Sequence, residues 1–152
     1  MKFTNSLIKG KLLKRYKRFF ADIKVNNKII TAHCPNTGSM HGLLDQGNEV
    51  LVTEHINPKR KLKFTLEIIK ANKRYVGVNT HRANKIVNHG LENKLISEFK
   101  TIKNIKPEFK FSDDTRFDYL CDNNLIEVKN VTLFRENDVA EFPDAVTSRG
   151  TK

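Results

Sequence analysis

The sequence predicts an α+β chain in two parts, a small β-barrel or sandwich followed by a mixed domain with one helix and several strands. Short apolar segments separated by turn residues fill the first half of the 152 residues. After Arg82 the apolar residues take a helical spacing, and strand-like segments return in the last third. This length suffices for one medium domain or two small ones.

Five strand candidates succeed one another in the first part. They are RYKRFFADIKV (15–25), KIITAHC (28–34), EVLVTEH (49–55), LKFTLEIIKA (62–71) and RYVGVNT (74–80). Turn signals such as Asn26-Asn27 and Gly47-Asn48 separate some of them. A five-stranded barrel of the oligonucleotide-binding (OB) type fits the number of strands and the charge, and a simple sandwich fits nearly as well.

The second part reads as a helix followed by three strands. Residues 83–101 have helical apolar spacing with a possible break at His89-Gly90, and strand candidates follow at 107–111, 116–121 and 125–134. We therefore expect domains at 1–84 and 85–152. One helix leaves a face of this small sheet uncovered, so we expect the second domain to be incomplete.

The net charge of +11 is concentrated in the first part. Residues 1–84 hold 17 Lys or Arg and 5 Asp or Glu, whereas residues 85–152 hold 11 and 12. Such asymmetry favours a polyanionic partner, nucleic acid first and an anionic membrane surface second. A lysine-rich composition typical of an AT-rich genome would give a similar count.

Other features point to a cytoplasmic protein without a membrane anchor. No run of about 18 apolar residues is present, and the first twenty residues lack a secretory signal. Cys34 and Cys121 are far apart in sequence, so we expect free buried thiols rather than a disulfide.

The basic segment before Phe19-Phe20 is the first candidate for nucleic-acid binding, because cations neutralise phosphates and aromatic rings can stack on bases. The rings of Tyr16, Phe19 and Phe20 could equally belong to the core. The Pro35–Gly38 turn can bring backbone close to a phosphate or serve only as a turn. The candidate phosphate-binding residues are Lys14, Arg15, Lys17, Arg18, Asn36, Thr37, Gly38, Arg82 and Arg149.

The stretch RFDYLCDNNLIEVKN (116–130) contains a second candidate site. Residues i and i+2 of a strand share a face, so Glu127 and Lys129 lie on one side. If 116–121 and 124–129 form a hairpin, Asp118 lies opposite the region of Glu127. Two carboxylates would suit Mg²⁺ or Mn²⁺, and Lys129 could assist hydrolysis of a phosphodiester. The alternative is a solvated cross-strand ion cluster of little energetic value.

Asp118 followed by Glu127-Val128-Lys129 resembles the signature of the restriction-endonuclease-like nucleases. More specific segments are RYKRFFADI, HCPNTGSM, VNTHRANKIV, RFDYLCDNNLIEVKNVTL and FPDAVTSRG, which in this order resemble the sugar fermentation stimulation protein family, SfsA. The resemblance implies an OB barrel, a nuclease-like second domain, sequence-tolerant DNA binding and a regulatory link to sugar, especially maltose, metabolism. Because family members continue well beyond the last segment, it also implies a fragment or a natural truncation.

The nuclease fold often takes a further acidic residue from its first helix, for which Glu98 is our choice and Glu92 the second. The sequence thus predicts a DNA-binding protein with a possible Mg²⁺- or Mn²⁺-dependent site at Asp118, Glu127, Lys129 and Glu98. The alternatives are a non-enzymatic DNA-binding regulator, in which these residues form a structural cluster, and an RNA-binding module. Single- or double-strand preference and oligomeric state stay undetermined by the sequence.

Overall fold

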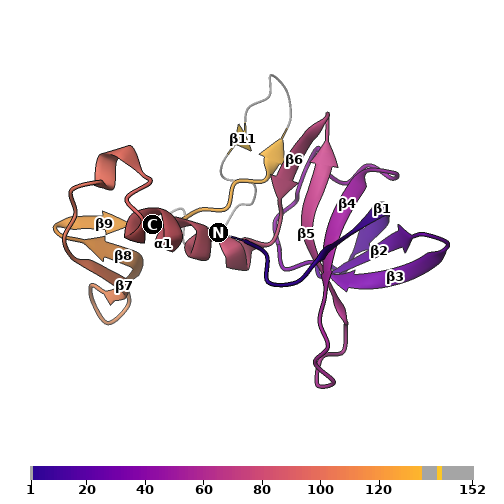
Figure 1. Ribbon diagram of the computed structural model, residues 1–152, viewed down its shortest axis with the longest axis horizontal. Helices are drawn as coiled ribbons and strands as arrows, with labels where there is room; N and C mark the ends of the chain where they lie inside the picture. The colour runs from indigo at the N-terminus through magenta and orange to yellow at the C-terminus, as the bar shows by residue number, and fades with distance from the viewer. Residues whose placement is uncertain (1, 135–139, 142–152) are drawn as a thin grey trace. The chain divides into compact units, whose positions relative to one another are not determined.

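The computed structural model describes residues 2–134 and 140–141 (Figure 1). Within these residues, strands precede and follow one α-helix, α1, which is flanked by two short 3₁₀ helices, η1 and η2. The elements are β1 Leu7–Tyr16, β2 Phe20–Val25, β3 Lys28–His33, β4 Glu49–Glu54, β5 Phe64–Ala71, β6 Arg74–Gly77, η1 Thr80–Arg82, α1 Ala83–Glu92, η2 Ser97–Phe99, β7 Ile105–Lys110, β8 Arg116–Cys121, β9 Asn124–Ile126, β10 Leu133–Phe134 and β11 Ala140–Glu141.

The chain forms two compact units. One contains Lys2–Thr80 together with the described residues from Val131 onward, and the other contains His81–Asn130. The first holds the six-stranded sheet, and the second holds α1 and the three-stranded sheet. Among the described residues, no helix is long and apolar enough to cross a membrane.

The first unit is a closed barrel, which confirms the OB-type prediction over the sandwich. The strands follow the order β3-β2-β1-β4-β5-β6, and β3 also pairs with β5 in parallel through Ala32–Phe64 and His33–Thr65. This contact closes β1–β5 into a five-stranded barrel, with β6 added to β5 as a hairpin. Because β3 pairs with β5, the sheet has no open edge between these strands through which solvent could reach the interior.

The barrel interior is apolar because alternate residues of each strand point inward. Ala21 and Ile23 are fully buried on β2, while Phe20 and Asp22, which alternate with them along the strand, are only half-buried. Gly10 lies where β1 crosses close to β2, and a Cβ there would approach Ile23 Cγ2 to 2.6 Å. The core residues are Leu12, Ala21, Ile23, Ala32, Cys34, Met40, Leu43, Val50, Val52, Leu66, Ile69, Ala71 and Val78.

The second unit packs α1 and the segment after it with β7–β9. Leu91 of α1, Tyr119 and Cys121 of β8 form its buried core. The predicted break at His89-Gly90 is wrong, since α1 continues to Glu92. Gly90 is buried, and a Cβ there would touch Ile96 at 3.2 Å, so its small size serves packing rather than a break.

Both cysteines are free and buried, as expected. Burial raises the pKa of the Cys34 thiol and of the Cys121 thiol. Next to Cys121, the turn between β8 and β9 is fixed by Asp122, whose carboxylate accepts backbone N–H bonds from Asn104 (3.0 Å) and Lys103 (3.2 Å). These bonds hold the pKa of Asp122 below its usual value.

Candidate functional site

Two pairs of stacked rings lie where β1, β2 and β3 meet on the outside of the barrel. Tyr16 and Phe20 are cross-strand partners whose ring centroids are 5.5 Å apart at an interplanar angle of 17°. Phe19 stacks on His33 at 6.4 Å and 19°, and Phe20 is the cross-strand partner of His33. Phe19 is 45% exposed and the other three rings are half-buried. This aromatic row therefore offers π-surfaces to solvent.

Asp22 is an acidic residue beside the aromatic row, and its carboxylate is bound by its neighbours. Asp22 accepts hydrogen bonds from the hydroxyls of Thr31 (2.8 Å) and Tyr16 (3.3 Å), and Lys14 lies 3.6 Å from its second oxygen. The ammonium of Lys14 also lies 5.3 Å from the centre of the Tyr16 ring. These contacts fix the Tyr16 ring and offset the negative charge of Asp22.

The turn between β1 and β2 presents two exposed cations next to the rings. Lys17 and Arg18 have positive φ angles of 47° and 62°, which form the tight reversal into Phe19. Non-glycine residues rarely take this conformation, so the turn is specified by the pairing of the flanking strands. Both side chains are exposed, and Arg18 directly precedes Phe19 of the aromatic row.

Arg15 holds the barrel together through its guanidinium. Nη2 donates to the carbonyl oxygens of Asn36 (2.8 Å) and Arg18 (3.0 Å), Nε donates to Arg18 O (3.2 Å), and Nη1 lies 3.5 Å from Ser39 O. The planar donor fork thus links the β1–β2 turn to the loop after β3. We expect Arg15 to support this end of the barrel, while its contact with phosphate stays a prediction.

Asn36 has a similar internal role. It is 4% exposed, its Oδ1 accepts the Gly38 N–H at 2.8 Å, and its amide donates to the Thr132 hydroxyl at 3.2 Å. Thr37 at the outside of this turn is exposed, and Gly38 is half-buried. Of the three residues predicted here, Thr37 has the side chain best placed for a ligand.

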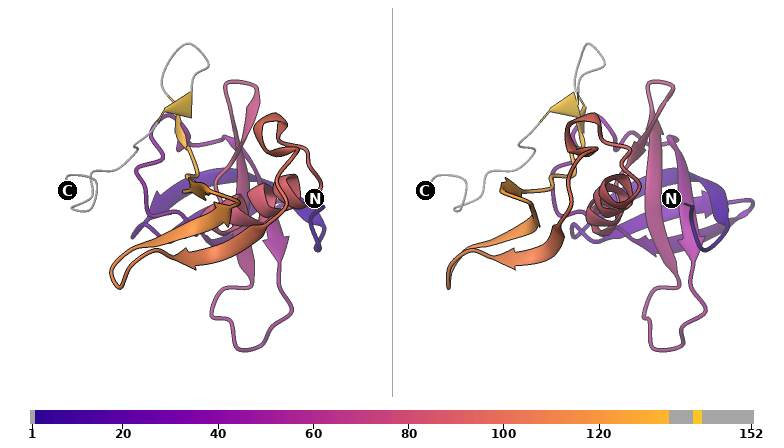
Figure 2. Two further views of the ribbon diagram at one scale, coloured as in Figure 1. Left: turned by 90° about the vertical axis from the view of Figure 1, so that its left-hand side faces the viewer. Right: turned by 60° about the vertical axis from the view of Figure 1, so that its left-hand side comes forward.

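A basic loop that the sequence analysis did not single out joins β4 and β5. Residues 55–63 contain no acid, and Lys59, Lys61 and Lys63 are exposed. Figures 1 and 2 show this loop extending beyond the ends of the strands that it joins. Its far end enters β5 beside β3, because His33 pairs with Thr65. The base of the loop therefore lies next to the aromatic row. The four cations among residues 59–63 were the sequence signal that could have identified this loop as a candidate.

In the second unit, Asp118 is the centre of a small hydrogen-bond network. Its Oδ1 accepts from the Asn84 amide at 2.6 Å and its Oδ2 from the Val128 N–H at 2.7 Å. Tyr119 in turn donates its hydroxyl to Asn84 O at 2.8 Å. Burial, and then the negative charge of Asp118, raise the pKa of Tyr119. Asn84 of α1, which the sequence did not indicate, thus orients the carboxylate.

Glu127 and Lys129 follow β9, which ends at Ile126 rather than continuing to 129 as expected. Their side chains form an exposed ion pair, in agreement with a common side for residues i and i+2. In the observed register of β8 and β9, Tyr119 pairs with Ile126, so Asp118 lies one residue beyond the end of this pairing. Its carboxylate accepts the Val128 N–H and thereby contacts the backbone between Glu127 and Lys129. The three residues are thus neighbours, although Lys129 rather than Asp118 is the partner of Glu127.

The remaining predicted residues have separate surroundings. Glu98 lies in η2 rather than in α1, is exposed, and accepts a hydrogen bond from Ser97 at 2.6 Å that lowers its pKa. Glu92 ends α1 and contributes to the field at Tyr119. Arg82 ends η1 and is half-buried, and Arg149 lies outside the described residues.

Hard oxygen ligands of the right chemistry are present for Mg²⁺ or Mn²⁺. Mg²⁺ needs only one or two carboxylates because it keeps several waters, and Asp118 and Glu127 are the two candidate carboxylates here. Asp118 already accepts hydrogen bonds at both oxygens, and Glu127 is paired with Lys129. Within the part of the chain that the structure describes, no three His, Cys, Asp or Glu side chains converge into a group that could hold a metal. A closed, fully protein-ligated site is therefore not formed by these residues.

Comparison with known proteins gives two adjoining matches. Residues 13–78 match the family described as SfsA N-terminal OB domain, and residues 81–152 match the sugar fermentation stimulation protein RE domain. The structure of Pyrococcus furiosus SfsA in complex with Ca²⁺ is similar in fold, with a TM-score of 0.80 and 24% identity over 99% of this chain and 64% of that chain.

Curated relatives are described as sugar fermentation stimulation protein homologs. A sugar fermentation stimulation protein homolog of Pelagibacter ubique is 63% identical over the whole of this chain and 67% of its own length. The homolog of Alteromonas mediterranea is 46% identical and is covered over 68% of its length. The chain thus spans about two thirds of the length of the relatives that it matches. By both domain matches and this identity, the chain belongs to the sugar fermentation stimulation protein (SfsA) family.

Proposed function

We propose that this protein binds nucleic acid, DNA in the first place, on the outside of its barrel where β1, β2 and β3 meet. The observation that carries the proposal is the aromatic row next to the exposed cations of the β1–β2 turn. The outer face of strands β2 and β3 is also where OB barrels generally hold oligonucleotides.

The chemistry of this surface favours binding with little sequence preference. Every base has a π-face, so stacking on Phe19 or Tyr16 is worth about 1–3 kcal/mol per base without selecting among bases. Lys17 and Arg18 would add phosphate contacts, each of which contributes roughly −0.7 to the salt slope on a single strand or −0.9 on a duplex. Neither the stacking nor the phosphate contacts require recognition of base edges.

The test is fluorescence anisotropy with labelled single-stranded and duplex oligomers over a range of salt concentrations. The double variant Lys17→Ala/Arg18→Ala should weaken binding to all sequences and flatten the slope by about 1.4–1.8. Its matched control is Lys73→Ala/Arg74→Ala, because these exposed residues lie at the β5–β6 turn, at the opposite end of β5 from Thr65. Equal effects from both pairs would refute this surface and indicate a response to net charge alone.

A ring variant separates stacking from charge. Phe19→Ala should weaken binding about 5- to 150-fold on single strands and leave the salt slope unchanged. A change in sequence preference instead would argue for base readout. Competition between RNA and DNA oligomers of equal sequence tests the RNA alternative, because an RNA preference requires contacts to the 2′-hydroxyl.

A second candidate function is metal-dependent phosphodiester hydrolysis in the RE domain. The observation that favours it is the bond from Val128 N–H to Asp118, because Val128 lies between Glu127 and Lys129 in the chain. Bound Mg²⁺ or Mn²⁺ would supply Lewis acidity and an activated water. Asn84 holds the Asp118 carboxylate in place, and Lys129 would leave Glu127 to meet the negative charge of the scissile phosphate.

Plasmid and single-stranded DNA incubated with Mg²⁺ or Mn²⁺, with EDTA as the control, tests this candidate. Cleavage that is lost in Lys129→Ala while DNA binding persists would support hydrolysis. If neither metal gives cleavage, with this chain or a full-length relative, the cluster is structural and the protein is better described as a non-enzymatic DNA-binding regulator. The name of its relatives, sugar fermentation stimulation protein, suggests that such regulation would concern sugar fermentation.

A further inference from the structure

The β4–β5 loop has an exposed apolar residue near its base that the nucleic-acid surface described above does not use. Ile56 is 98% exposed, more than any other large apolar side chain among the described residues. Scattered apolar residues on a surface are ordinary. Ile56 differs from such residues because it is almost fully exposed in a loop, residues 55–63, that contains four cations and no acid.

This loop is held by its own hydrogen bonds. His55 N–H donates to Lys63 O at 2.8 Å and closes the base of the loop. Within it, the Asn57 side-chain oxygen accepts Lys59 N–H at 3.0 Å, and Asn57 O accepts Arg60 N–H at 3.1 Å. Ile56 therefore projects from an ordered turn, so contact with a ligand requires little new ordering of the backbone.

The loop is tied to the barrel at the end that has the aromatic row. Arg60 donates to the Thr65 hydroxyl at 2.9 Å, and Thr65 is the partner of His33 in the parallel pairing of β3 and β5. His33 in turn stacks with Phe19. A strand that stacks on the aromatic row can therefore continue onto this loop.

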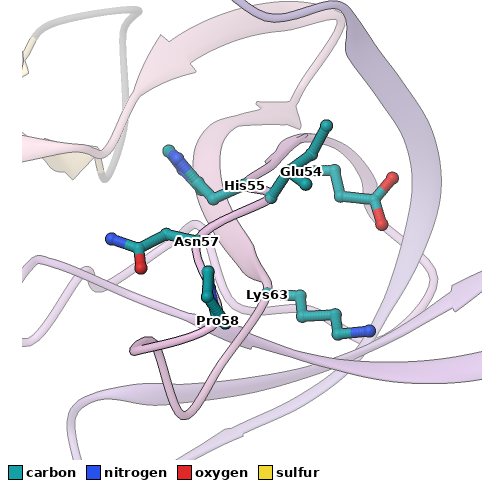
Figure 3. Close-up of a pocket in the computed structure, with 6 residues that line it drawn as sticks. Glu54, His55, Asn57, Pro58 and Lys63 are labelled. Carbon is teal, nitrogen blue, oxygen red and sulfur yellow. The ribbon is translucent and has the colours of Figure 1, made fainter.

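A shallow pocket of about 270 Å³ lies along the same loop (Figure 3). It is lined by Glu54, His55, Ile56, Asn57, Pro58 and Lys63. Figure 3 shows the side chains of Glu54 and Lys63 extending to the same side of the loop. The pocket combines an apolar wall with a carboxylate acceptor and an ammonium donor, which suits an unstacked base whose phosphate faces the lysines.

We propose that Ile56 is an apolar wedge that separates adjacent stacked bases of a bound nucleic acid, while Lys59, Lys61 and Lys63 hold the flanking phosphates. The inference rests on the proposed nucleic-acid binding and adds a second contact with a different chemistry. Apolar wedges of this kind unstack base steps in architectural DNA-binding proteins at a moderate energetic penalty. The lysines alone could not unstack bases, and an exposed isoleucine without cations beside it would not attract DNA.

The experiment compares Ile56→Ser with Ile29→Ser in the full chain. Ile29 is the matched control because it is also exposed, at 68%, and lies four residues from His33 at the other end of β3. Anisotropy with a labelled oligomer should show about tenfold weaker binding for Ile56→Ser at every salt concentration, with an unchanged slope. Ile29→Ser should bind as the wild type does.

Unstacking has its own readout. An oligomer containing 2-aminopurine gains fluorescence when its neighbours separate, so the wild type and Ile29→Ser should raise the signal and Ile56→Ser should not. The double variant Lys59→Ala/Lys61→Ala should instead flatten the salt slope by about 1.4 on a single strand.

The outcomes distinguish this inference from the function on which it rests. If the wild type binds and Ile56→Ser binds and unstacks equally well, the wedge is refuted while nucleic-acid binding stands. If the wild type binds no oligomer, the proposed function fails first. Vesicles of equal phosphatidylserine and phosphatidylcholine provide the remaining arm: binding to them that Ile56→Ser abolishes, with oligomer affinity unchanged, would overturn the wedge in favour of a membrane contact.

Discussion

Replacing Arg15 tests whether this cation is structural, in contrast to Lys17, which we propose contacts phosphate. Its guanidinium reaches three backbone carbonyls, and the 2.8 Å bond to Asn36 O is the shortest and the most buried of them. A hydrogen bond to a charged group contributes about 1.5–3 kcal/mol, whereas the solvent-exposed bonds to Arg18 O add little. Arg15→Ala should therefore destabilise the barrel by about 2 kcal/mol.

The effect is large enough for a thermal unfolding experiment. For a domain of this size, about 1 kcal/mol corresponds to a shift of about 4–8 °C in Tm, so Arg15→Ala should lower the midpoint by about 8–16 °C. Arg15→Lys keeps the charge but loses the planar fork, and it should recover only part of this loss. Lys17→Ala serves as the control, because this exposed side chain makes no such link, and its midpoint should stay within about 2 °C.

Salt titration of DNA binding completes the comparison. Arg15→Lys should retain the wild-type slope at a temperature where it is folded, and Lys17→Ala should flatten the slope by about 0.7–0.9. If Arg15→Ala melted with the wild type and flattened the slope as much as Lys17→Ala, the reasoning would be refuted. Arg15 would then be a phosphate contact that the hydrogen bonds to Asn36 and Arg18 do not restrain.

Three further predictions concern stability and reactivity. Gly10→Ala should destabilise the barrel by about 1–3 kcal/mol in urea unfolding, because the added Cβ meets Ile23 Cγ2 at 2.6 Å, and an unchanged midpoint would mean that β1 shifts freely. Ellman's reagent near pH 8 should react slowly with the native protein and with two thiols after denaturation, since burial raises the pKa of both Cys34 and Cys121; fast native reaction of either would contradict this. Because backbone N–H bonds hold the folded pKa of Asp122 below its unfolded value of about 4, its stabilisation is present above that pH and is lost as pH falls through the folded pKa. The difference in Tm between wild type and Asp122→Asn should accordingly be largest at neutral pH and shrink in acid, and a difference that grows in acid would reverse the assignment.

Much of the architecture could be predicted from local pattern. Strands with alternating apolar residues, turn pairs such as Asn26-Asn27 and the helical spacing after Arg82 are properties of short segments, and β3 to β6 and the start of α1 appear near their expected places. The expected strand 15–25 is instead divided by the turn between β1 and β2, most of β1 was not expected as a strand, and α1 ends at Glu92. The family resemblance had the same basis, because it depended on contiguous motifs. Gly90 shows where local reasoning fails: glycine signals a helix break in isolation, but here Ile96 occupies the space that a side chain would take.

The candidate sites divide in the same way. Residue type and spacing were enough to indicate basic residues before an aromatic pair and to place Glu127 and Lys129 on one side. Which cation faces solvent and which binds backbone was beyond the sequence, because Arg15 and Arg18 differ only in the carbonyls that folding brings to them. Asn84 is another such case, since it lies 34 residues from the carboxylate that it orients.

The sequence by itself determined that this chain pairs a strongly basic β domain with a helix-and-strand domain, and it identified the family, because charge, periodicity and motifs are all carried by neighbouring residues. Only the tertiary structure decided that β3 meets β5 to close the barrel and that His33 stacks on Phe19. It also showed that Ile56 in the β4–β5 loop is fully exposed and that Arg60 of this loop bonds to Thr65, the partner of His33. These contacts join residues far apart in the sequence, and their geometry depends on the register of strands that no single segment specifies.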